Sequence, residues 1–163
     1  MPNNKIVQNP WIFFADNDLA FAETAVGNAQ FTGEVAFLCQ QAVEKYLKAI
    51  LFELKIPIQK THDLIKLYDK IKEFKNLDID ETLFESLCDL YIESRYPTDI
   101  ALLNGEVLPS VEKAKAYFDF AKNVANIVKS EIEILRQEWK RESEKLASLP
   151  FLPQHSNREV SRC

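Results

Sequence analysis

The feature that most constrains the fold is the segment from Gly33 to Lys55, where hydrophobic residues recur at helical spacing. Ten hydrophobic positions form a broad face: Val35, Leu38, Cys39, Ala42, Val43, Tyr46, Leu47, Ile50, Leu51 and Leu54. The polar positions form a strip that covers only about a third of the helix circumference: Gln41, Glu44, Lys45 and Lys48. Because so apolar a helix must be covered on most sides, we expect it at the centre of a helical bundle, or also in a dimer interface.

Capping residues mark the starts of four further helices. Asn9 precedes a proline and a hydrophobic pattern, which predicts a helix start, and Gly27 follows the expected end of that helix. Thr61 is the expected cap of a third helix, and a fourth begins near Asp80. A long fifth helix is expected from about Ser110.

These patterns together predict an all-helical domain. Pro97 ends the fourth helix, because the residue before a proline is pushed out of the α region, and the fifth runs past Leu135. Only three glycines occur in 163 residues, and no long stretch alternates β-branched with polar residues, which argues against sheets. We predict an all-α, antiparallel up-and-down four-helix bundle with an additional short helix over residues 9–138. Residues 139–163 are expected to form a poorly ordered C-terminal tail.

Composition disfavours several classes of function. The net charge of −5 weakens the case for broad nucleic-acid binding, although a local basic patch remains compatible with it. No signal peptide is visible, and no apolar run approaches the roughly 18 residues that a membrane span needs. The three cysteines are odd in number and far apart, so we expect a reducing cytoplasm. Two histidines without clustered ligands predict no metal site, and no cofactor-binding motif is present.

Charged residues that interrupt hydrophobic stripes indicate where a site could form, because burying a charge is costly unless it is paired. Asp18 lies on such a stripe in the first helix, and Arg95 continues one to the last turn of the fourth. Together with Lys45 they could form a cluster, either a structural ion-pair network or a pocket that binds a phosphate or nucleotide. Glu44 and Lys48 have the i,i+4 spacing of a helical ion pair.

His62 follows the expected cap of the third helix. One interpretation is a first-turn residue whose ring hydrogen-bonds locally. The other is a catalytic base, which would need a nucleophile or metal partner, and none is near in sequence.

Four segments, in this order, resemble the HEPN family: DNDLAFAETA at 16–25, QQAVEKYLKAILFEL at 40–54, THDLIKLYDKI at 61–71 and SRYP at 94–97. The resemblance covers about three quarters of the chain. It implies four long helices plus a short one, nucleotide binding, and usually a homodimer. Many bacterial and archaeal members sit beside a minimal nucleotidyltransferase and are thought to act with it as a toxin–antitoxin pair or a two-part transferase.

Many HEPN proteins are also metal-independent ribonucleases, with an arginine, a polar residue and then a histidine a few positions on. Here Arg95 and Tyr96 are followed by no histidine before His155, so the acid–base partner is missing. We therefore expect no catalytic residue, and a nucleotide- or RNA-associated binding module as the first hypothesis. Its candidate residues are Asp18, Glu44, Lys45, Lys48, His62, Arg95 and Tyr96. The alternatives are a degenerate metal-independent ribonuclease toxin, built on Arg95 and His62, and a purely structural interaction protein.

Overall fold

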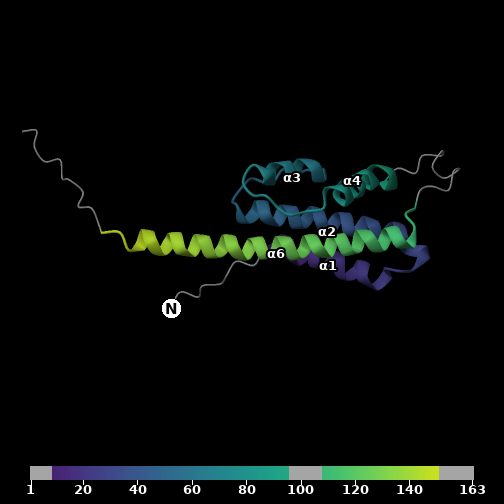
Figure 1. The fold of residues 1–163 in the computed structure, drawn as a ribbon, viewed down its shortest axis with the longest axis horizontal. Coiled ribbons are helices and arrows are strands. Elements are labelled where there is room, and N and C mark those ends of the chain that lie inside the picture. Colours follow the sequence, from purple (N-terminus) through teal and green to yellow (C-terminus); the bar gives the residue numbers. More distant parts are fainter. Residues whose placement is uncertain (1–8, 96–107, 151–163) are drawn as a thin grey trace, which may run out of the picture.

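Helix α2 (Thr32–Glu53) lies at the centre of the bundle, and the other helices pack around it (Figure 1). The computed structural model describes residues 9–95 and 108–150. Within these ranges all regular secondary structure is helical: α1 (Pro10–Ala25), the 3-10 turn η1 (Ala29–Phe31), α2, α3 (Leu64–Lys72), α4 (Glu81–Arg95) and α6 (Val111–Ala147). The predicted helical bundle with one short additional helix, α3, is confirmed.

Contacts between helix ends establish the directions of the long helices. The side-chain amide of Asn9, at the start of α1, donates to the carbonyl of Ala49 near the end of α2 at 3.0 Å, so these two helices are antiparallel. Arg136, late in α6, pairs with Glu53 at the end of α2 at 2.7 Å, so α6 runs in the same direction as α2. Helix α4 ends at the end of the molecule where α6 begins (Figure 1).

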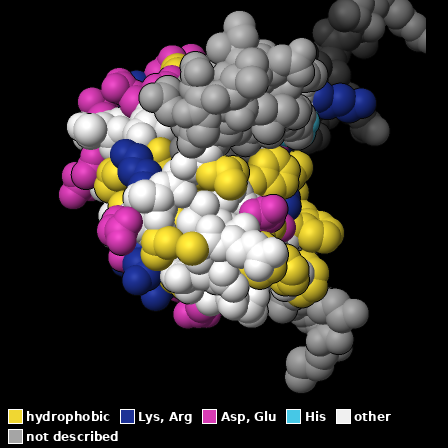
Figure 2. Space-filling view, turned by 90° about the vertical axis from the view of Figure 1, so that its right-hand side faces the viewer, with side chains coloured by type: hydrophobic (Ala, Val, Ile, Leu, Met, Phe, Trp, Pro, Cys, Tyr) yellow, Lys and Arg dark blue, Asp and Glu magenta, His cyan; other side chains and the backbone are white. Residues whose placement is uncertain are grey.

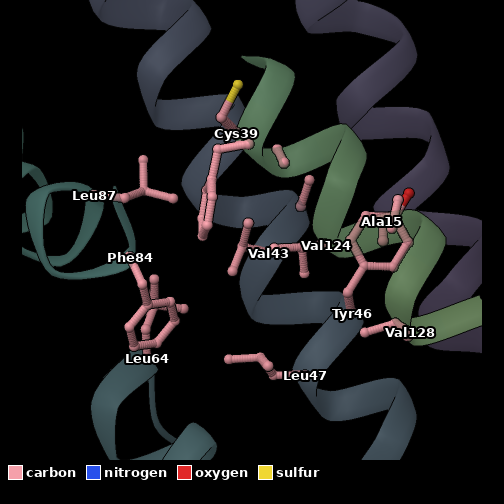
Figure 3. Close-up of a cluster of buried hydrophobic side chains, with 14 of the residues drawn as sticks. Ala15, Cys39, Val43, Tyr46, Leu47, Leu64, Phe84, Leu87, Val124 and Val128 are labelled. Carbon is pink, nitrogen blue, oxygen red and sulfur yellow. The ribbon is translucent and has the colours of Figure 1, made fainter. Parts of the chain in front are cut away.

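The core surrounds α2 on several sides (Figure 3). It contains side chains from each of the main helices: Ala15, Cys39, Val43, Tyr46, Leu47, Leu64, Phe84, Leu87, Val124 and Val128. Fourteen residues of α2 are buried, and α1, α3, α4 and α6 supply the cover. The apolar circumference of α2 is therefore explained within one chain, and the alternative that it forms a dimer interface is not needed to explain it.

Three predicted helix starts are confirmed by their caps. Asn9 Oδ1 accepts from the backbone N–H of Trp11 at 3.1 Å, and Ser110 Oγ accepts from that of Lys113 at 3.1 Å. Asp80 Oδ1 accepts from the backbone N–H of Leu83 at 3.0 Å and so caps α4. These contacts satisfy backbone donors that have no partner inside a helix.

The predicted start of the third helix needs a correction. Asp63, not Thr61, is the N-cap: its Oδ1 accepts from the backbone N–H of Lys66 at 3.1 Å. Thr61 Oγ1 accepts from the N–H of Asp63 at 3.0 Å and so forms a turn before the helix. Both residue types favour such local bonds, and the carboxylate is also stabilised by the positive end of the helix dipole.

Helix α6 is longer than the sequence pattern predicted. It continues through Ala147, so residues 139–147, which were expected to belong to a poorly ordered tail, are helical. Every residue from 137 to 150 is exposed, and an exposed helix needs no hydrophobic periodicity, so the pattern there is weak. Residues 151–163 lie outside the described residues.

Several large hydrophobic side chains are exposed on α1 and the adjoining turn. Phe13, Phe14 and Phe21 are 63%, 54% and 67% exposed, and Phe31 of η1 is 40% exposed. Figure 2 views the end of the molecule where α1 and α4 end, and hydrophobic side chains gather along one side of that surface. The bundle therefore presents an apolar surface in addition to its core.

Candidate functional site

The polar strip of α2 contains two charged residues that are buried. Glu44 and Lys48 are 3% and 5% exposed, and Lys48 Nζ lies 2.7 Å from Glu44 Oε1. Lys48 Nζ also lies 5.2 Å from the centre of the Trp11 ring of α1, which is close enough for a cation–π contact. Pairing within the helix and contact with the ring compensate the desolvation of both charges.

His62 connects this buried pair to the surface. Its Nδ1 lies 3.1 Å from Glu44 Oε2 and 3.2 Å from Glu44 Oε1, while its side chain is 55% exposed. The ring therefore contacts a buried carboxylate, while more than half of the side-chain surface is exposed to solvent. Neither interpretation from the sequence placed His62 beside Glu44, because the two residues are 18 positions apart.

A second polar group links α1, α2 and α6. Lys45 of α2 forms an ion pair with Asp18 of α1. Asp16, two residues before Asp18 in α1, accepts a hydrogen bond from the Tyr46 hydroxyl and lies 2.7 Å from Lys129 Nζ of α6. Burial and the contact with Asp16 raise the pKa of Tyr46, so its hydroxyl remains a donor. These contacts join three helices, as a structural network would.

Arg95 and Tyr96 are not placed relative to these groups. Arg95 is the last residue of α4, but its side chain is outside the described part of the structure, and so is all of Tyr96. The structure thus brings Asp18 and Lys45 together, whereas a cluster of both with Arg95 stays a prediction.

A pocket of about 510 Å³ lies beside His62, between α2, the start of α3 and α4. Its described lining consists of Gln40, Lys60, Thr61, His62, Asp63, Leu64, Ile65, Cys88 and Asp89. Gln40 is 2% exposed, and its Nε2 is the one buried side-chain nitrogen or oxygen of the described residues that has no hydrogen-bond partner. A buried amide N–H without an acceptor is costly, and a ligand in the pocket would supply that acceptor.

Sequence reasoning missed Gln40, although a signal for it exists. Gln40, Glu44 and Lys48 follow one another at four-residue spacing and therefore lie along one line of α2. The sequence interpretation instead grouped Glu44 with Gln41, whose amide donates to Gln40 Oε1 at 3.3 Å. A continuous polar line on an otherwise apolar helix indicates a buried polar site rather than a solvated face.

The surroundings of Cys39 and Cys88 disfavour the thiolate form of both side chains. Desolvation raises the pKa of Cys39 and of Cys88 to about 12, so both remain thiols near neutral pH. The described ranges contain no group of three or more histidine, cysteine, aspartate or glutamate side chains placed to hold a metal ion. Nor does any helix in those ranges combine the length and hydrophobicity needed to cross a membrane.

The fold and the buried polar line define a class: an all-helical domain whose central helix carries charged groups to the edge of a pocket. The model of the HEPN domain family matches residues 9–132, which is most of the chain and spans all the described helices up to the middle of α6. This chain therefore belongs to the HEPN family, as its sequence resemblance indicated. Neither the curated proteins nor the solved structures contain a significant match to it.

Proposed function

We propose that this domain is a binding module for a nucleotide or for RNA. In this proposal it acts in the cytoplasm as a homodimer, with a minimal nucleotidyltransferase as partner in a toxin–antitoxin-like pair. Its membership of the HEPN family, a helical domain associated with nucleotides and RNA, supports the proposal. The observation that carries it is the pocket beside His62, whose wall contains Gln40 with its unpaired amide nitrogen.

The lining of this pocket suits a nucleotide better than a bare phosphate. Lys60 provides a full positive charge, but Asp63 and Asp89 line the same pocket. Their carboxylates would repel a bare phosphate, so charge alone does not make this an anion site. Leu64 and Ile65 add apolar surface, and Gln40 offers a hydrogen-bond donor at depth. A pocket of this size, mostly apolar with a few directed polar groups, is typical of small-ligand sites.

Ligand-induced stabilisation tests the binding proposal. A ligand that binds only the folded state raises the thermal midpoint, and at 100 times its Kd the gain is about 2.7 kcal/mol. We expect ATP or a short single-stranded RNA to raise the midpoint of the wild type, and Lys60→Ala and His62→Ala to reduce the increase. Lys115→Ala, an exposed lysine of α6 outside the pocket lining, is the matched control and should retain it.

The contact between Glu44 and His62 favours a second candidate, the degenerate ribonuclease. A buried carboxylate that holds an exposed imidazole is an arrangement suited to general acid–base catalysis. Because the histidine expected after Arg95 is missing, we expect the purified protein not to cleave RNA above background. Cleavage that is abolished by His62→Ala or Arg95→Ala would instead establish the ribonuclease.

Co-purification tests the partner assignment. A nucleotidyltransferase encoded by the neighbouring gene should co-elute with the wild-type chain in size-exclusion chromatography. If the two proteins elute separately when each is present at tens of micromolar, the partner assignment is wrong. The proposal of a binding pocket does not depend on that outcome.

A further inference from the structure

The charged lining of the candidate pocket indicates which part of a nucleotide enters it. Two carboxylates, Asp63 and Asp89, line the pocket together with Cys88. Desolvation contributes most to the raised pKa of the Cys88 thiol, and the negative charges of neighbouring carboxylates, Asp63 and Asp89 among them, raise it further. A phosphate would be repelled from this part of the pocket, whereas N–H donors of a ligand would be attracted to it.

Of the two carboxylates, Asp89 is the one that can accept hydrogen bonds from a ligand without losing a contact. Asp63 Oδ1 caps α3, and Asp63 Oδ2 lies 3.2 Å from Lys66 Nζ. Asp89 is an exposed residue of α4, and it takes part in no hydrogen bond or ion pair within residues 9–95 and 108–150. Both of its oxygens can therefore accept from a bound molecule.

Gln40 requires the opposite kind of partner. Its Nε2 is buried and lacks an acceptor, whereas its Oε1 already accepts from Gln41 Nε2 at 3.3 Å. Helices α2 and α4, which carry Gln40 and Asp89, pack against each other, and both residues line the same pocket. The pocket thus combines a buried hydrogen-bond donor with an exposed carboxylate acceptor. A complementary ligand presents an acceptor beside N–H donors.

Among the common nucleobases, guanine matches this pattern best. Its Watson–Crick edge carries the acceptor O6 beside two adjacent donors, N1–H and the N2 amino group. Adenine, cytosine and uracil each present one donor group with an acceptor atom next to it, so that acceptor would face a carboxylate oxygen. Two parallel N–H bonds to one carboxylate are charge-assisted and fix the orientation of the bound group.

The rest of the lining suits the faces of a base and its phosphate. The His62 side chain is 55% exposed and its ring contacts Glu44, and Ile65 is 49% exposed; both His62 and Ile65 line the pocket. Bases stack on aromatic rings, histidine included, and pack against apolar side chains. Lys60, which is exposed, provides the positive charge that a phosphate requires.

We propose that this pocket recognises guanine, with the Gln40 amide donating to O6 and the Asp89 carboxylate accepting from N1–H and the N2 amino group. The base packs against His62 and Ile65, and its phosphate pairs with Lys60. This inference rests on the proposed binding function and names its ligand class, a guanine base of a free nucleotide or of RNA. It gives Asp89 the role of selecting the base.

Calorimetric titration with GTP and ATP tests base selection, because the two ligands carry the same phosphates. We expect the wild type to bind GTP about tenfold or more tightly than ATP, which corresponds to one hydrogen bond to a charged group. A short oligoadenylate, and the same oligonucleotide with one guanosine, distinguish the sources. If the pocket serves RNA, the guanosine-containing oligonucleotide binds about tenfold more tightly than the oligoadenylate, and GTP binds more weakly than either.

Asp89→Asn should change which base is preferred. Asparagine keeps the size of aspartate, but an NH₂ donor replaces one acceptor oxygen and would face the amino group of guanine. Xanthine has a carbonyl at that position. The variant should therefore bind GTP about tenfold more weakly than the wild type does, and xanthosine triphosphate more tightly. Glu85→Gln alters an exposed carboxylate one turn earlier on α4, outside the pocket lining, and should leave both affinities unchanged.

The outcomes separate this inference from the proposed function. A preference for guanine that Asp89→Asn reduces and Glu85→Gln retains supports guanine recognition. If GTP binds no more tightly than ATP, and the guanosine adds nothing to the oligonucleotide, guanine recognition is wrong and the nucleotide- or RNA-binding module stands. A preference that survives Asp89→Asn overturns the role of Asp89. If the wild type binds none of these ligands, both the inference and the proposed function are wrong.

Discussion

Glu44 and Lys48 form a 2.7 Å ion pair in which the two side chains are only 4% and 7% exposed. They belong to the polar strip that the sequence placed on α2, yet they lie inside the bundle, between Trp11 and His62. The pair therefore differs from an exposed i,i+4 pair on a helix surface, which contributes only a few tenths of a kcal/mol.

Breaking this pair should cost far more than its i,i+4 spacing suggests. Lys48→Met leaves the Glu44 carboxylate buried without its cation, so we expect a loss of about 3–5 kcal/mol in the free energy of unfolding. Replacing both residues, with Glu44→Leu and Lys48→Met, should recover much of the loss. Urea unfolding of the two variants measures the difference.

Lys45→Met is the matched control for this prediction. Lys45 lies one residue from Glu44, and its ion pair with Asp18 is about a fifth exposed on each side. Its loss should be nearer 1 kcal/mol, because water solvates the remaining carboxylate. Equal losses for Lys45→Met and Lys48→Met would contradict the difference in burial.

The N-cap of α3 should make stability depend on pH. The backbone N–H of Lys66 donates to Asp63 and lowers the pKa of that carboxyl, with opposing desolvation and an added contribution from the Lys66 side chain. A lowered pKa contributes stability that is complete above the unfolded value of about 3.9 and is lost as the pH falls through the folded value. Asp63→Ala should cost about 1 kcal/mol near neutral pH, and that cost should shrink at acid pH.

Asp63→Asn separates charge from capping in the same experiment. Asparagine accepts the same hydrogen bond and does not titrate, so its advantage over alanine should stay constant between pH 6 and pH 3. Chemical denaturation of the three proteins across this range measures both effects. A wild-type advantage over alanine that is independent of pH would show that the charge of Asp63 contributes nothing.

Lys55 occupies a backbone conformation that favours glycine. It has φ of 60° directly after α2, and Ile56 N–H donates to the carbonyl of Leu51 at 3.0 Å, the bond pattern of a glycine-capped helix end. Lys55→Gly should raise the free energy of unfolding by up to about 1 kcal/mol.

Lys55→Ala is the control for Lys55→Gly. Both substitutions remove the contact of the ammonium with the Phe52 ring, but alanine keeps the strain of a side chain at positive φ. Thermal unfolding should rank glycine above both lysine and alanine. Alanine at least as stable as glycine would show that the strain at this position is negligible.

The helices could be predicted because their signals are local. Asn9, Asp80 and Ser110 each cap a helix through a bond to a backbone N–H within three residues, so the sequence itself contains both partners. The third start was placed two residues early because Thr61 and Asp63 both make such bonds. The end of α6 was missed because its residues from 137 onward are exposed, so burial imposes no hydrophobic period on them.

The site could be predicted only in part because its contacts are not local. The sequence selected Glu44, Lys48 and His62 as candidates. It did not indicate that the Glu44 carboxylate contacts both Lys48 and His62. That contact depends on the path of the chain after α2, which turns the segment before α3 back along the helix. Gln40 was missed because a glutamine on a helix normally faces solvent, and only packing reveals that its amide is buried.

Calorimetric titration of wild type and Gln40→Leu with ATP and with a short single-stranded RNA tests the central claim most directly. Leucine has a similar size and removes the unpaired donor, so the variant should fold at least as stably as wild type. We predict saturable binding of one of these ligands to the wild type, and at least tenfold weaker binding to Gln40→Leu. Absence of binding to the wild type, or equal affinity in both proteins, would contradict a nucleotide or RNA site in this pocket.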